Sequence, residues 1–188
     1  MDVEFSDKET LKAELLRHGF PQMMLTRNTR SFLGSSISGV TKGFYNHFCW
    51  LTSIDKVASQ DWIFHSVDLD DYLTDKYIVK FVIDNRWNRI ARQKLIGAIN
   101  NDLNQPFYKR LYDPLAILGQ LTGLKWLQIP MLDICSDYGC YLKLTDSKYN
   151  LKYPNPSSIN VYQKENQAST INNNLGYLVT ARWIPGDI

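Results

Sequence analysis

The stretch Asp133-Ile134-Cys135-Ser136-Asp137-Tyr138-Gly139-Cys140 joins a helix start to a thiol. Asp133 is a residue type that caps helix N-termini, so it predicts that Cys135 lies in the first turn of a helix. Backbone amides in that turn have no partner within the helix, and the positive end of the helix favours a thiolate over a thiol. The same amides can bind the oxyanion that forms when sulfur attacks a carbonyl. Cys135 is therefore a candidate nucleophile that still needs a base.

Burial without a chemical role is the alternative interpretation of each cysteine, because cysteine is often buried in protein cores. That interpretation suits Cys140, which is deeper in the predicted helix, and Cys49, which shares a strand with the bulky Trp50. The odd count of three cysteines and the closeness of Cys135 to Cys140 argue against a disulfide framework.

The candidate base lies in residues 43–52, which form the best strand pattern of the chain. Pleating places His47 and Cys49 on one face of this strand, and Phe48 and Trp50 on the other, so we expect both faces to be covered. A hydrogen-bonded core histidine is the alternative interpretation of His47.

A second histidine follows in residues 61–67, which we predict to be the next antiparallel strand after a polar connection over residues 53–60. His65 on that strand can meet His47 across the sheet. One imidazole could then act as the base and the other as its orienting partner.

Cys135, His47 and His65 could also be interpreted as a metal site. The chain lacks the short CxxC or HxxxH spacings that usually hold zinc, and it has neither a glycine-rich phosphate loop nor a GxSxG nucleophile elbow. We therefore expect no metal and no cofactor.

The remaining sequence patterns predict further helices and strands. Ser6 opens a capping box before an N-terminal helix within residues 1–20, and Gly19 ends that helix. Further expected elements are a short strand at residues 23–26, a strand at 77–83, a helix to residue 103 with Ile90 and Leu95 on its buried face, a helix at 113–123, and a closing strand at 176–184. Short connections predict that the strands at 43–52, 61–67 and 77–83 form a meander. Residues 147–175 read as a long irregular segment with a short helix around residues 159–164.

The composition limits the class of protein. At 188 residues, with 44% hydrophobic and 21% charged residues, the chain suits one folded domain over residues 1–188. The net charge of +2 is spread among mixed charges, so we do not expect nucleic-acid binding. The acidic, polar start does not match a secretory signal, and no apolar run is long enough to span a membrane. The sequence does not decide the oligomeric state.

Five short motifs occur in a recognisable order: Met24-Leu25-Thr26, Tyr45-Asn46-His47, Phe64-His65-Ser66, Tyr112-Asp113 and Ile134-Cys135-Ser136-Asp137. This order resembles the circularly permuted branch of the papain-like NlpC-type hydrolases, which includes YiiX-like proteins and relatives of lecithin retinol acyltransferase. The resemblance covers residues 21–145. It implies that Cys135 is the nucleophile, that His47 is the general base and then acid, that His65 is the third polar group, and that Tyr112 contacts the oxyanion. It also implies an α+β papain-like domain, with an antiparallel sheet of strands near 43–52, 61–67, 77–83 and 176–184 packed against the cysteine helix.

The activity implied by this resemblance is acyl transfer to water through a thioester on Cys135. A peptide amide of the bacterial cell wall, peptidoglycan, is the expected substrate, and a lipid ester or amide, hydrolysed or passed to an acceptor, is the second. The alternative is a non-catalytic structural or interaction protein, for example a phage virion component that keeps the fold. We expect a cytoplasmic protein or one carried in a virion or secreted particle.

Overall fold

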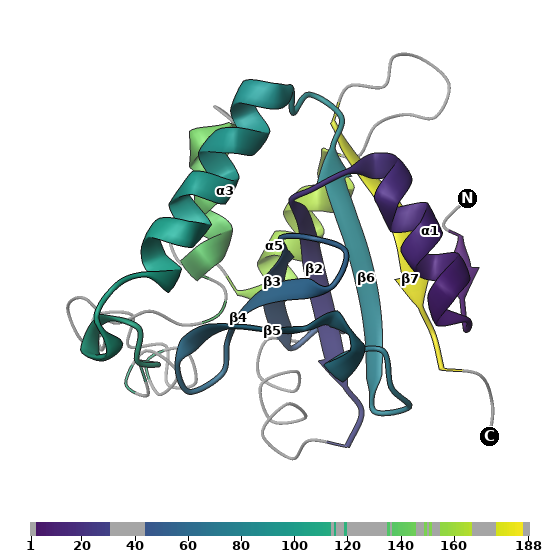
Figure 1. The fold of residues 1–188 in the computed structure, drawn as a ribbon, viewed down its shortest axis with the longest axis horizontal. Helices are drawn as coiled ribbons and strands as arrows, with labels where there is room; N and C mark the ends of the chain where they lie inside the picture. Colours follow the sequence, from purple (N-terminus) through teal and green to yellow (C-terminus); the bar gives the residue numbers. More distant parts are fainter. Residues whose placement is uncertain are drawn as a thin grey trace.

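A mixed sheet of seven strands, in the order β1-β7-β6-β2-β3-β4-β5, forms the centre of the part of the chain that the structure describes (Figure 1). This computed structural model describes residues 3–30, 44–113, 115, 119, 135, 137–145, 149, 151, 155–166 and 176–185. The strands are β1 (Glu4–Phe5), β2 (Gln22–Asn28), β3 (His47–Leu51), β4 (Lys56–Gln60), β5 (Phe64–Asp68), β6 (Tyr77–Asp84) and β7 (Tyr177–Trp183). The α-helices are α1 (Lys8–His18), α3 (Arg89–Leu103) and α5 (Pro156–Glu165), and the 3-10 segments are η1 (Leu69–Asp71), η2 (Phe107–Lys109) and η3 (Asp137–Leu144). The α+β class is therefore confirmed.

Most predicted strands are present, but their arrangement differs from the expected one. The predicted meander is wrong, because β6 pairs with β2 and β7 and does not follow β5 in the sheet. The expected strands pair antiparallel, but the sheet as a whole is mixed, because the additional strand β1 runs parallel to β7 at one edge. The order differs because β2 is buried along Gln22–Thr26 and takes strand partners on both sides, a pairing that the lengths of the connections do not reveal.

Residues 56–60, expected to be part of a connection, form β4 between β3 and β5. Val57, Ala58, Ser59 and Gln60 are all buried, so the polar side chains here lie inside the molecule. Consequently His47 and His65 are not on neighbouring strands, which corrects the sequence prediction.

Helix caps explain where α1 and α3 begin. The Asp7 carboxylate accepts a hydrogen bond of 2.8 Å from the Thr10 amide, so Asp7 caps α1 in place of the predicted Ser6. Gly19 ends α1 with φ +68°, a conformation that favours glycine. The Asn88 amide oxygen caps α3, which buries Leu95 as expected but leaves Ile90 64% exposed, contrary to the prediction.

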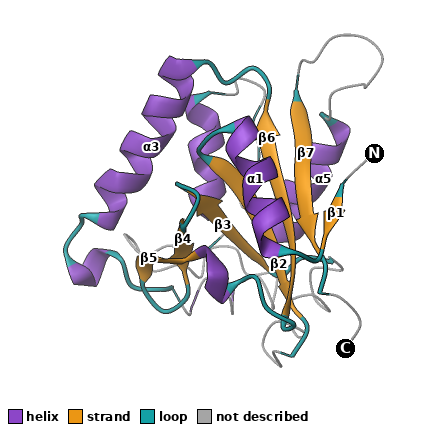
Figure 2. Ribbon diagram, turned by 45° about the vertical axis from the view of Figure 1, so that its right-hand side comes forward, coloured by secondary structure: helices purple, strands orange, loops and turns teal. Residues whose placement is uncertain are grey.

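Two hydrophobic cores lie on opposite faces of the sheet, with α1 on one side and α5 on the other (Figure 2). Successive side chains of β3 point to opposite cores, as predicted. Cys49 and Leu51 pack in the core that contains α1 residues, and Phe48 and Trp50 pack in the core that contains α3 and α5 residues. The terminal strand and the short helix predicted near the C-terminus are confirmed as β7 and α5.

The predicted cysteine helix is only partly described. Cys135 lies in a turn two residues before η3, which is a 3-10 helix and not the expected α-helix. The Asp133 cap, the side chain of Cys140, most of the predicted helix at 113–123 and much of the segment at 147–175 lie outside the described residues. Of the helices described, none is long and apolar enough to cross a membrane.

Candidate functional site

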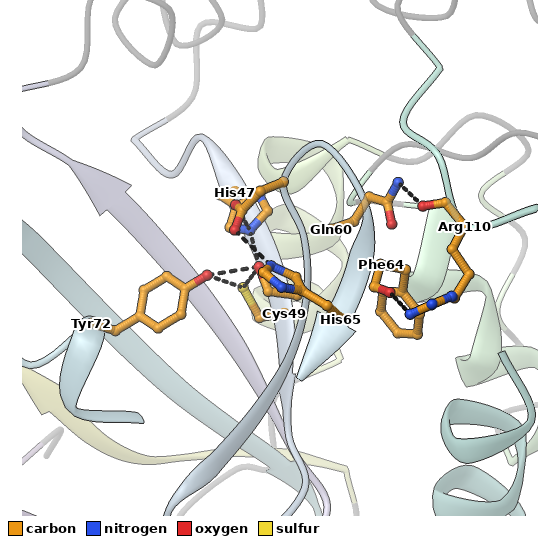
Figure 3. Close-up of polar contacts among 9 residues, drawn as sticks. His47, Cys49, Gln60, Phe64, His65, Tyr72 and Arg110 are labelled. Atoms are coloured by element: carbon orange, nitrogen blue, oxygen red, sulfur yellow. Dashed lines mark hydrogen bonds and ion pairs between the residues drawn. The ribbon is translucent and has the colours of Figure 1, made fainter. Parts of the chain in front are cut away.

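His47 begins β3 and points its imidazole at the neighbouring strand β4 (Figure 3). Its Nε2 atom lies 2.9 Å from the Ser59 hydroxyl, and Cys49 and Ser59 are paired in the β3–β4 register. The His47 side chain is 17% exposed. The imidazole is thus held from the sheet side while part of it remains accessible.

Asp61 directly follows β4 and links the two histidines. One carboxylate oxygen lies 3.6 Å from His47 Nε2, and the other lies 3.3 Å from His65 Nε2. The structure therefore brings His47 and His65 to one carboxylate, although β4 separates their strands. Sequence reasoning missed Ser59 because residues 53–60 were interpreted as a connection, and it treated Asp61 only as the start of the strand at residues 61–67. The spacing of Ser59 and Asp61, two residues apart and so on the same side of an extended chain, was the available signal.

Behind His47, three buried polar side chains contact one another. The Ser59 hydroxyl lies 2.7 Å from the Tyr72 hydroxyl, and the Cys49 sulfur lies 3.7 Å from Ser59 Oγ and 3.6 Å from Tyr72 Oη. Ser59 is fully buried and Tyr72 is 5% exposed. A continuous set of hydrogen-bonding groups therefore runs from the imidazole into the core.

Burial decides the protonation of these groups. It lowers the pKa of His47, and the Asp61 charge opposes this effect without overcoming it. Burial also raises the pKa of the Cys49 thiol, against hydrogen bonds from Tyr72 and Ser59, and raises the pKa of the Tyr72 hydroxyl. At neutral pH the site thus contains a neutral imidazole, a protonated Cys49 thiol and a protonated phenol.

Cys135 is buried, at 6% exposure. Its charge adds to the raised pKa of the Cys49 thiol, whose main cause is burial. After Cys135, η3 packs in the core that contains α3 and α5 residues, where the Tyr141 ring lies 6.2 Å from that of Trp50. Cys135 therefore precedes the segment that covers the Trp50 face of β3.

Tyr112 lies beside the turn that carries Asp61. Its amide donates a hydrogen bond of 2.9 Å to the Trp62 carbonyl, and the two rings meet edge to face at 6.5 Å. Nearby, the Arg110 carbonyl accepts a hydrogen bond from the Gln60 side chain, and the Arg110 guanidinium donates one of 3.0 Å to the Phe64 carbonyl (Figure 3). Segment 110–112 thus holds the β4–β5 turn, whereas the oxyanion role of Tyr112 stays a prediction.

Among the residues that the structure describes, no group of three or more histidine, cysteine or acidic side chains is arranged to hold a metal ion. Comparisons of the chain with protein-family models, with curated proteins and with solved structures found no match. The interpretation of function therefore rests on the motifs of the sequence and the geometry of the site.

Proposed function

We propose that this chain is a papain-like cysteine hydrolase in which Cys135 attacks a carbonyl carbon and His47 accepts the thiol proton. The observation that carries the proposal is the state of His47: a partly buried imidazole of lowered pKa whose Nε2 atom is held by Ser59 and faces Asp61. A neutral imidazole is the form that can act as a base at neutral pH.

The contacts of His47 also favour one nitrogen for the reaction. A carboxylate only accepts hydrogen bonds, so Asp61 at 3.6 Å favours a proton on Nε2. The lone pair is then on Nδ1, which is the nitrogen that would take the proton from Cys135. Once His47 is charged, the same carboxylate stabilises the imidazolium.

The proposed reaction has two halves. Sulfur bonds to the substrate carbonyl carbon while the thiol proton moves to His47, and the tetrahedral intermediate then expels its amine, which takes that proton and leaves a thioester. Water attacks the thioester with His47 again accepting a proton, and that proton returns to the sulfur as the acid departs. In this scheme His65 acts through Asp61, whose carboxylate lies 3.6 Å from His47 Nε2 and 3.3 Å from His65 Nε2.

A peptide amide of the bacterial cell wall is the substrate that we propose, and the order of the sequence motifs supports it. Lipid esters and amides form the second substrate class, and a chain without activity would correspond to the structural alternative.

Iodoacetamide labelling across pH tests the nucleophile. Cys135 is expected to react first, because Cys49 is 1% exposed against 6% for Cys135 and burial keeps the Cys49 thiol protonated. His47→Gln should slow this reaction, whereas His18→Gln should not, since His18 contacts Glu14 on α1. Equal reactivity of Cys49 and Cys135, or no effect of His47→Gln, would contradict the proposal.

Digestion of peptidoglycan tests the substrate class. Release of soluble fragments by the wild type and by Cys49→Ala, with none by Cys135→Ala, is the expected result. Equal release by the wild type and Cys135→Ala would remove Cys135 from the mechanism. If neither releases fragments, a parallel assay with fatty acyl esters and amides separates the lipid class from the structural alternative.

A further inference from the structure

We infer that Tyr72 is a positioning residue. Its hydroxyl accepts a hydrogen bond from the Ser59 hydroxyl, so that the Ser59 oxygen can accept a hydrogen bond from His47 Nε2. The inference rests on the proposed function, because the tautomer of His47 matters for catalysis only if this residue is the base. It adds to that function a residue outside the sequence motifs, supplied by the segment that follows η1.

The contacts allow two arrangements of hydrogens. In the first, His47 Nε2–H donates to Ser59, and Ser59 donates to Tyr72 across 2.7 Å. In the second, both hydrogen bonds are reversed, so that Tyr72 donates to Ser59 and Ser59 donates to an unprotonated Nε2. A hydroxyl group can serve either arrangement, so the Ser59 contacts alone do not choose between them.

Asp61 selects the first arrangement. Asp61 lies 3.6 Å from Nε2 and favours a hydrogen on that nitrogen, because a carboxylate can only accept hydrogen bonds. The buried Cys49 thiol can donate to Ser59 Oγ at 3.7 Å or to Tyr72 Oη at 3.6 Å, so it has an acceptor in either arrangement. The Asp61 carboxylate therefore decides between the two.

Removing the Tyr72 hydroxyl would break this balance. Ser59 is fully buried, so its hydrogen would lose an acceptor that no surface water replaces easily. The nearest strong acceptor left is His47 Nε2, at 2.9 Å. Ser59 would then turn to donate, and the imidazole proton would move to Nδ1, the nitrogen that the reaction needs unprotonated.

NMR of the imidazole nitrogens in histidine-labelled protein tests this directly, since the chain contains only three histidines. The wild type should carry the His47 proton on Nε2, and Tyr72→Phe should move a large part of the population to Nδ1. Tyr77→Phe is the matched control: its ring lies 5.2 Å from that of Tyr72, but its hydroxyl bonds toward Asn28 and not toward Ser59. Both variants keep the aromatic packing, and thermal unfolding checks that they remain folded.

The alkylation rate of Cys135 gives the second measurement. Tyr72→Phe is expected to lower it about fivefold, the effect of one buried hydrogen bond on the active tautomer, while Tyr77→Phe leaves it unchanged. A wild-type proton on Nδ1, or the same tautomer in the wild type and Tyr72→Phe, would overturn the inference. If the tautomer shifts as expected but Cys135 is unreactive even in the wild type, the hydrogen-bond arrangement stands and the proposed hydrolase fails.

Discussion

Asp61→Asn is the substitution that most directly tests how the site is held together. Asparagine keeps the shape of the side chain and removes the charge that lies 3.6 Å from His47 Nε2. Protonated His47 would lose its nearest counter-ion, whereas neutral His47 would lose little. We therefore expect the variant to bind a proton at His47 more weakly than the wild type.

The geometry sets the size of this effect. Two unit charges 3.6 Å apart interact by about 4 to 5 kcal/mol at an effective dielectric constant near 20. The Asp61 carboxylate is 52% exposed, so solvent reduces this to about 1 kcal/mol, in the range measured for exposed ion pairs. The proton affinity of His47 should thus fall about fivefold, and added salt should shrink the difference between the two proteins.

NMR titration of the His47 ring protons in both proteins measures this affinity. Asp68→Asn is the matched control, because Asp68 is similarly exposed but pairs with Lys56 and not with an imidazole. An unchanged or increased proton affinity in Asp61→Asn would refute the reasoning. It would mean that Ser59 alone holds the imidazole and that Asp61 has no electrostatic role.

Three further outcomes are expected. Trp50→Ala should lower the free energy of unfolding by about 3 to 5 kcal/mol in urea titrations, since the ring is fully buried, whereas Trp62→Ala, 75% exposed, should change it by about 0.5 kcal/mol or less. Asn88→Ala should cost about 1 kcal/mol in the same assay, because it removes the cap of α3, and a loss no larger than for Trp62→Ala would count against that cap. As the pH falls through 6.5, His47 binds a proton more readily in the unfolded chain than in the folded protein, where its pKa is lowered. Stability should therefore fall with acidification, and less so in His47→Gln.

Local patterns were sufficient for much of the fold. The strands β2, β3, β5, β6 and β7 and the helix α5 follow from apolar runs, alternation and helix signals, each of which lies within a few consecutive residues. Alternation along β3 also predicted that Cys49 and Trp50 face different cores, and the structure confirms it. The Asp7 cap was missed by one position because Ser6 and Asp7 are both good capping residues.

The candidate site depended on contacts that no local pattern contains. His47 and His65 were identified from the sequence, but the carboxylate between them was not, because it becomes visible only once β4 is placed between β3 and β5. The contact of Ser59 with Tyr72 likewise joins a strand to the segment after η1.

The sequence by itself determined the α+β class, most of the strands and the residues that could carry chemistry, because these depend on residue type and on spacing along the chain. Only the tertiary structure decided the strand order, the position of Asp61 between two imidazoles and the buried polar groups behind His47. The physical reason is that strand register and side-chain burial depend on which distant segments pair, and those pairings arise from the packing of the whole core.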